Sequence, residues 1–179
     1  MPSSGRIRRL RSDNGGEICN SSFDSFCRQR GILREFTSPY SPEQNGKCER
    51  MNRTLMDKAR SMLHGAGLSF QFWPYAIDTA AFLVNRSATS SNGSGFQTPF
   101  ELWYGSSPDL SNLRVFGCTC FLHIPSSLRS KLDAKAEKGI FLGYDLQSVC
   151  YRVWVLSSKQ VKLSVHVTFN ETLPESTPS

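Results

Sequence analysis

The sequence predicts an α/β domain followed by a small all-β barrel. Hydrophobic stripes with a helical period occur before residue 105, whereas short β-prone stretches dominate after residue 113. The chain has 179 residues and a hydrophobic content of 39%, which is enough to bury a core. We therefore expect an α/β domain at residues 1–105, a barrel at residues 106–170 and a disordered tail at residues 171–179.

The first half of the chain alternates short β-prone stretches with helical periodicity. A loop must interrupt it at residues 38–46, because this segment holds two prolines and a glycine. In the first helix Ser21 or Ser22 can cap the N-terminus, and Gly31 can end it. The expected elements are strands at residues 6–11 and 32–37 and helices at residues 21–30, 47–64 and 70–84.

The helix expected at residues 47–64 has the clearest period. Glu49 projects to the margin of its apolar stripe, where the core would anchor a carboxylate that still faces a cleft. In the next helix Pro74 falls in the first turn, where its missing N–H is tolerated. The stripe expected to face the core is formed by Met51, Leu55, Ala59 and Met62.

The second half begins with a linker-like segment, residues 87–95, and a short helix at residues 99–104. From Val161 to Phe169 apolar and polar residues alternate, which predicts one half-buried strand. Several short strands close together favour a small barrel. The other β-prone stretches are residues 115–124, 139–144 and 151–156, and the three tryptophans, Trp73, Trp103 and Trp154, are expected in the core.

Two carboxylates stand out by their setting. Asp13 follows the strand expected at residues 6–11, and Glu49 lies just inside a helix, with 35 residues between the two. Carboxylates on different rigid elements are what a pair of divalent ions needs for phosphoryl transfer. The bland alternative is a turn aspartate and a glutamate favoured by the helix dipole.

The motifs around these carboxylates resemble those of the integrases of copia-type retrotransposons. These integrases belong to the DD(35)E polynucleotidyl transferases with a ribonuclease-H-like fold. The resemblance extends over about residues 6–169. It rests on residues 10–17 (LRSDNGGE), 39–46 (PYSPEQNG), 49–55 (ERMNRTL), 72–73 (FW), 85–86 (NR), 98–105 (TPFELWYG), 113–118 (LRVFGC), 131–133 (KLD) and 139–144 (GIFLGY).

The resemblance implies a partial ribonuclease-H-like core followed by an SH3-like barrel. It also implies that Asp13 and Glu49 bind Mg²⁺ or Mn²⁺ and that the complete enzyme carries out 3′-end processing and strand transfer. The partners would be retrotransposon ends and target DNA, and the enzyme would be a homo-oligomer. The residues expected near DNA are Gln44, Asn45, Lys47, Arg53, Lys58 and Arg60, although charged side chains on a helix can also simply be solvated.

Such integrases use a third carboxylate upstream of the Asp-Asn-Gly-Gly motif. Twelve residues precede Asp13 and none of them is acidic, so we expect the isolated chain to be catalytically incompetent. The open strand at residues 6–11 predicts poor autonomous stability for the first domain. The alternative function is a non-catalytic remnant that binds nucleic acid or another integrase subunit.

Composition adds few constraints. The net charge of +6 favours polyanionic partners. No stretch is apolar and long enough to span a membrane, and no signal peptide is visible. The six cysteines have no zinc-binding spacing, so we expect reduced thiols and no structural zinc. These features predict a location in the nucleus or cytoplasm rather than secretion.

Overall fold

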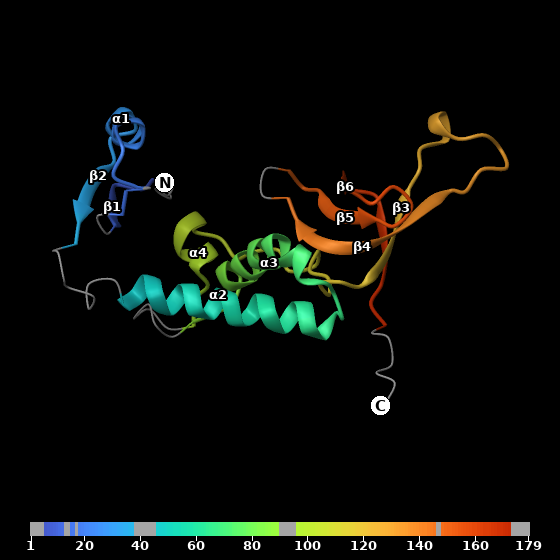
Figure 1. The fold of residues 1–179 in the computed structure, drawn as a ribbon, viewed down its shortest axis with the longest axis horizontal. Coiled ribbons are helices and arrows are strands. Elements are labelled where there is room, and N and C mark those ends of the chain that lie inside the picture. The colour runs from blue at the N-terminus through green and yellow to red at the C-terminus, as the bar shows by residue number, and fades with distance from the viewer. Residues whose placement is uncertain are drawn as a thin grey trace.

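The computed structural model describes residues 6–12, 15–16, 18–37, 46–89, 96–145 and 148–172 of the chain. Three parts follow one another along the sequence (Figure 1): a small βαβ unit, a group of helices and a five-stranded sheet. The predicted order of an α/β segment followed by an all-β segment is confirmed.

The N-terminal unit consists of two parallel strands joined by a helix. Strand β1 (Arg9–Ser12) pairs with β2 (Leu33–Phe36), and the register sets Ser12 opposite Phe36. Helix α1 (Ser21–Gln29) provides the crossover that parallel strands require. Both strands are shorter than predicted.

Helix α1 begins at Ser21, as predicted, and ends at Gln29, one residue before the predicted end, but its N-cap differs from the prediction. The side chain of Asn20 accepts a hydrogen bond from the backbone N–H of Phe23 at 2.8 Å, so Asn20 is the N-cap. The prediction of Ser21 or Ser22 is therefore wrong, because asparagine caps as well as serine and lies one residue earlier. Gly31 follows the helix with a φ of 67°, the left-handed conformation that favours glycine at this position.

Helices α2 (Gly46–Gly65) and α3 (Trp73–Asn85) lie side by side (Figure 1). A 3₁₀ turn, η2 (Phe70–Phe72), leads into α3, and α4 (Pro99–Tyr104) follows it along the chain. Pro74 occupies the first turn of α3, as predicted. Among the described helices, none combines the length and hydrophobicity needed to cross a lipid bilayer.

The predicted core stripe of α2 is only partly right. Ala59 and Leu63 are buried, whereas Met51 is 46% exposed. The helix is thus buried only in its C-terminal half, where η2 and α3 contribute to the same apolar cluster. The prediction that Trp73 belongs to the core is wrong, because its side chain is 44% exposed while Ala76 on the same helix is fully buried.

The C-terminal sheet is antiparallel, with the strand order β6-β5-β4-β3-β7. A 3₁₀ turn, η4 (Ser126–Leu128), lies between β3 and β4 along the chain. In Figure 1 the connection between β3 and β4 projects away from the helices. The strands are β3 (Thr119–His123), β4 (Ala136–Tyr144), β5 (Tyr151–Val155), β6 (Gln160–Ser164) and β7 (Val167–Asn170).

The single strand predicted from Val161 to Phe169 is wrong. The segment forms β6 and β7, which lie at opposite edges of the sheet with only Val165 and His166 between them. The edges of a flat five-stranded sheet would be about 19 Å apart, but three residue steps span at most about 11 Å. The sheet must therefore curl until its edges approach, as in a small barrel.

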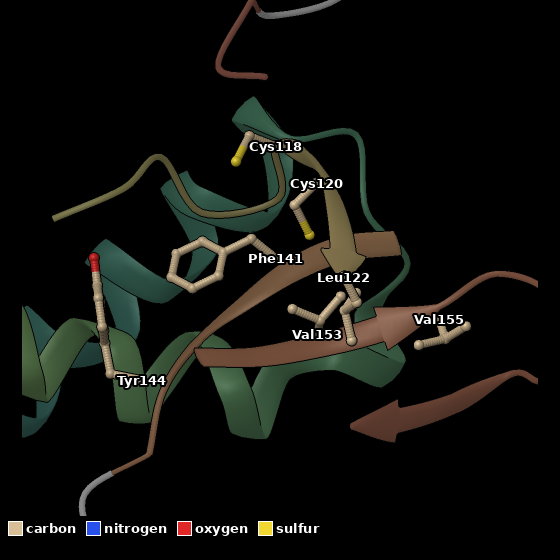
Figure 2. Packing of buried hydrophobic residues seen from close by; sticks show 7 residues of the cluster. All are labelled: Cys118, Cys120, Leu122, Phe141, Tyr144, Val153 and Val155. Carbon is tan, nitrogen blue, oxygen red and sulfur yellow. The ribbon is translucent and has the colours of Figure 1, made fainter. Parts of the chain in front are cut away.

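One apolar cluster lies within the sheet, between β3, β4 and β5 (Figure 2). Figure 2 shows Leu122 of β3 close to Val153 of β5, with Cys120 nearby. The ring of Phe141 meets other aromatic rings edge-on, including that of Tyr144 at 5.3 Å, a geometry that favours aromatic pairs. This cluster fixes the end of β4, where Tyr144 lies.

A second cluster joins the helices to the sheet. It contains Ala59 and Leu63 from α2 and Ala76 from α3. It also contains Leu142 from β4, and Phe116 from the segment that precedes β3. The half-buried Trp154 of the sheet also meets Phe72 of η2 edge-on, with the ring centroids 5.3 Å apart. The helices and the sheet therefore share a continuous core, although the predicted domain limits at 105/106 and 170/171 remain predictions.

Candidate active site

The strand that precedes Asp13 is in place. Ser12 is the last residue of β1, and its carbonyl accepts a hydrogen bond from the backbone N–H of Thr37 at 2.9 Å. The parallel pairing thus continues to the end of the strand. Asp13 itself lies outside the described residues, and its role stays a prediction.

Glu49 lies in the first turn of α2, with an exposed side chain. The N-terminal end of a helix carries partial positive charge, which stabilises a carboxylate there. Burial in the C-terminal half of α2 holds the helix against the rest of the chain. The carboxylate is therefore accessible, on a helix that is anchored at its other end. Gln44 and Asn45, predicted to lie near DNA, are outside the described residues.

The four predicted DNA-binding residues on α2 do not share one face. All four side chains are exposed. At about 100° per residue, Arg53 and Arg60 lie within roughly 40° of Glu49 around the helix axis. Lys47 and Lys58 lie about 160–180° away, on the opposite side. The helix thus brings together one carboxylate and two arginines, and it separates them from the two lysines.

The cations near Glu49 are only weakly engaged. Arg60 pairs with Asp57 at 3.0 Å, and both side chains are more than half exposed. Such surface pairs contribute at most about 1 kcal/mol, so a phosphate can compete for the guanidinium. By contrast, Arg9 and Arg11 of β1 both pair with Glu35 of β2, at 2.8 and 3.1 Å. Both arginines are also more than half exposed, so these pairs add little to the stability of the strand pair, but they hold the two side chains at Glu35.

The described residues do not form a complete metal site. Among them, no group of three or more His, Cys, Asp or Glu side chains is placed to hold a metal ion. Glu49 is the one expected ligand that can be located, and Asp13 lies outside the described range. All six cysteines are described, and they form no disulfide.

Sequence reasoning missed a groove that is lined by residues of α3, α4 and the sheet, including Trp103, and by no described residue of α2. It predicted Trp103 as a core residue, which is wrong because the side chain is 43% exposed. Trp103 belongs to α4, a helix of six residues that has no fully buried side chain. The signal in the sequence was the run Phe-Glu-Leu-Trp-Tyr, because so short a helix cannot bury four large apolar residues on one face.

Comparison with known families places both halves of the chain. Residues 30–69 match the integrase core domain, and residues 118–179 match the retroviral polymerase SH3-like domain. The chain is also 43% identical, over 93% of its length, to the retrovirus-related Pol polyprotein from transposon TNT 1-94 of Nicotiana tabacum. The chain belongs to the integrases of copia-type retrotransposons. The predicted resemblance is confirmed.

Two other relatives are similar to the chain. The integrase chain is 35% identical, over 93% of its length, to the Pol polyprotein from transposon RE1 of Arabidopsis thaliana. It is 32% identical, over 65% of its length, to the uncharacterized mitochondrial protein AtMg00710 of the same plant, of which it covers 97%. The chain spans only 12% and 11% of the two Pol polyproteins.

Two solved structures are similar to parts of the integrase chain. One is the simian T-cell lymphotropic virus intasome in complex with the PP2A regulatory subunit B56 gamma, at 17% identity and a TM-score of 0.47; 95% of this chain and 58% of that chain are covered. The other is the catalytic core domain of BIV integrase, at 27% identity and a TM-score of 0.38, with 53% and 58% covered.

The predicted fold class is confirmed. The integrase-core match, residues 30–69, takes in β2 and α2, and the SH3-like match, residues 118–179, takes in the curled five-stranded sheet. Integrase core domains depend, as a family, on divalent metal ions.

Proposed function

We propose that this chain is part of an integrase that processes retrotransposon DNA ends and joins them to target DNA. In this proposal Asp13 and Glu49 are two of the metal-binding carboxylates, and a third comes from outside residues 1–179. The ion is Mg²⁺ or Mn²⁺, because carboxylate oxygens are the ligands that these cations prefer.

The observation that carries the proposal is the setting of Glu49. Its carboxylate is exposed in the first turn of α2, on the side of the helix that also carries Arg53 and Arg60. A carboxylate beside two weakly engaged arginines suits a site where metal ions and phosphates meet. This arrangement supports a phosphodiester substrate over a neutral one.

The residues of the chain would divide the work. Glu49 would hold an ion, while Arg53 and Arg60 would bind the DNA backbone beside it. Divalent ions, when bound, would stabilise the charge of the transition state and activate the attacking water or 3′-hydroxyl. Gln44 and Asn45 would orient the DNA close to the site. All of these roles belong to the homo-oligomeric, complete enzyme.

The two remaining cations need a separate role. Lys47 and Lys58 lie on the far side of α2 from Glu49, so one straight segment of DNA cannot contact both faces. In this proposal they bind a second segment of DNA, as an enzyme that joins donor ends to a target requires. Each contact would add to affinity without reading the base sequence.

A second candidate function is a DNA-binding remnant without catalysis. It is favoured by one observation: Arg53 and Arg60 are exposed on α2 and can bind DNA phosphates whether or not a metal ion is held. Such a remnant would keep the cationic face of α2 and bind DNA in a salt-dependent way. The two candidates differ in whether Glu49 matters for chemistry.

Strand transfer in the presence of Mn²⁺ tests the proposal. The chain would be supplemented with the segment that precedes the matched region in the Nicotiana tabacum relative. We expect Glu49→Gln to abolish joining while DNA affinity stays within about twofold. Asp57→Asn, which changes an exposed carboxylate on the same helix, is the matched control and should retain activity.

Direct Mn²⁺ binding gives an independent readout. Glu49→Gln should weaken Mn²⁺ binding measured by electron paramagnetic resonance, and Asp57→Asn should not. Strand transfer that survives Glu49→Gln would eliminate the catalytic assignment. DNA binding without any Mn²⁺-dependent joining, in the supplemented chain, would favour the remnant.

A further inference from the structure

A groove of about 970 Å³ lies between α3, α4 and the turn that joins β4 to β5. None of its described lining residues comes from α2, so it is separate from the candidate active site. Its size is within the range of pockets that bind compact ligands or a few residues of a peptide. Six aromatic side chains line it: Phe82, Phe100, Trp103, Tyr104, Tyr144 and Tyr151.

The inner wall of the groove is preformed. The rings of Phe82 and Tyr144 stack with their centroids 4.0 Å apart and their planes at 13°. The guanidinium of Arg86 lies over Phe82 at 3.4 Å and over Phe100 at 5.0 Å. The hydroxyl of Tyr144 accepts a hydrogen bond from the backbone N–H of Arg114 at 2.8 Å. A partner would therefore meet a wall that needs little ordering.

The outer wall exposes apolar side chains. Trp103 is 43% exposed, Tyr104 is 59% exposed and Val149 is 85% exposed. Val165, which also lines the groove, is 51% exposed. Contiguous apolar patches on a protein surface mark interaction sites, and tryptophan and tyrosine dominate the energetics of such sites.

The charge of the groove differs in sign from that of the chain. Three lining residues are aspartates, Asp78, Asp109 and Asp145, and of the described lining residues only Arg86 is cationic. Hydrogen bonds from Ser111 and Ser148 lower the pKa of Asp109 and Asp145, so both remain ionised. Arg152 behind the groove pairs with Asp78 and Asp145 and reduces the negative charge without removing it. The whole chain carries a net charge of +6.

We propose that this groove docks a segment of a partner protein that carries one large apolar side chain flanked by lysine or arginine. The apolar side chain would lie against Trp103 and Tyr104, and the flanking cations would face Asp109 and share Asp78 with Arg152. Nucleic acid fits less well, because three lining carboxylates stand against the lining Arg86 and the neighbouring Arg152, and Arg86 is already held between two rings. The groove would thus bind a partner protein independently of α2, the helix that is proposed to bind DNA.

Fluorescence anisotropy with labelled nonapeptides tests the proposal on the full chain. The probes are Gly-Lys-Arg-Gly-X-Gly-Arg-Lys-Gly peptides with Phe, Trp or Leu at X, and the control peptide has Gly at X. An oligo-dT strand is the nucleic-acid probe. We expect at least one apolar peptide to bind at least tenfold more tightly than the Gly peptide. Trp103→Ala should weaken that binding at least about tenfold, whereas Phe70→Ala, an exposed aromatic outside the groove, should leave it unchanged.

A pair of charge substitutions at Val149 keeps the test valid if Trp103→Ala fails to fold. Val149 is almost fully exposed, so neither Lys nor Glu should disturb the fold. Val149→Lys should weaken binding of the cationic peptide up to about fivefold, and Val149→Glu should strengthen it by a similar factor. A merely structural role of this turn would not give effects of opposite sign.

Two results would overturn the proposal. One is that none of the three apolar peptides binds better than the Gly peptide. The other is that oligo-dT displaces the peptides and binds more tightly to Val149→Lys than to the unmodified chain, which would make the groove a nucleic-acid site. Tight peptide binding with the expected signs at Val149 supports a protein partner.

Discussion

Thr79 of α3 lies directly against Gly143 of β4, at the junction between the helices and the sheet. The Thr79 hydroxyl donates a hydrogen bond to the carbonyl of Leu142 at 3.4 Å and fills the space that a side chain at Gly143 would need. Gly143 also has a φ of 117°, and the pairing of β4 with β5 shifts register there. A glycine-dependent bulge therefore lets the sheet approach α3.

Gly143→Ala should destabilise the chain. The added Cβ would overlap Thr79, and the backbone conformation would be strained for alanine. We expect the free energy of unfolding to fall by about 2–4 kcal/mol, measured by urea denaturation followed by tryptophan fluorescence. Gly65→Ala is the control, because a Cβ there meets nothing within 4 Å, and it should change stability by less than about 1 kcal/mol. Equal losses in both variants would contradict the contact as the cause.

The shared core predicts how the chain can be divided. The fragment 106–170 would expose Leu142 and Phe116, which are buried against the helices in the full chain. We expect this fragment to aggregate or unfold, whereas the fragment 46–172 should melt in one cooperative step in circular dichroism. A stable, cooperatively folding 106–170 fragment would show that the helices are dispensable for the sheet.

The two cationic faces of α2 predict different roles in DNA binding. Replacing both Arg53 and Arg60 by alanine removes the cations beside Glu49, so binding of a donor-end duplex should weaken. The slope of the logarithm of affinity against the logarithm of salt concentration should shrink by about 1.8, since each lost phosphate contact contributes about 0.9.

The alanine pair at Lys47 and Lys58 is the matched control for the same duplex. It removes the same charge from the same helix on the opposite face, and should leave the salt slope for a single duplex almost unchanged. If both pairs of substitutions reduce the slope equally, binding reflects overall charge rather than the face that carries Glu49.

Sequence periodicity predicted which elements form, and it failed where tertiary neighbours decide. The stripe of α2 has the right period throughout, but only a partner can bury it, and the described partners cover Ala59 and Leu63 and leave Met51 exposed. Likewise, the alternation from Val161 to Phe169 is the same whether the chain stays on one strand or crosses to the other edge. Local patterns carry no information on either choice.

The candidate site was predicted from the spacing of motifs along the chain. Such spacing gives no information on sites that distant segments form together. The spacing placed Glu49 at the start of a helix, which the structure confirms. The helical period that placed Glu49 also separates Lys47 from Arg53, so the sequence contained this division and the prediction overlooked it. Spacing could not reveal the groove, which residues from α3, α4 and the segment between β4 and β5 build together. Sites assembled from distant segments need the fold.

The two buried thiols of the sheet predict a loss of stability at high pH. Burial raises the pKa of Cys118 to about 11 and that of Cys120 to about 12. Both groups are therefore neutral in the folded chain at pH values where an unfolded thiol, with a pKa near 9.0, ionises. Their contribution to stability is complete below about pH 9 and declines as the pH rises towards 11–12.

Urea denaturation between pH 8 and pH 11 measures this decline. We expect the free energy of unfolding to fall less steeply over this range in the double variant Cys118→Ala/Cys120→Ala than in the unmodified chain. Cys48→Ala removes an exposed thiol outside the sheet and is the control for the loss of a cysteine. Identical slopes in the unmodified chain and the double variant would place the pH dependence in other groups, such as Tyr144, whose pKa is also raised by burial.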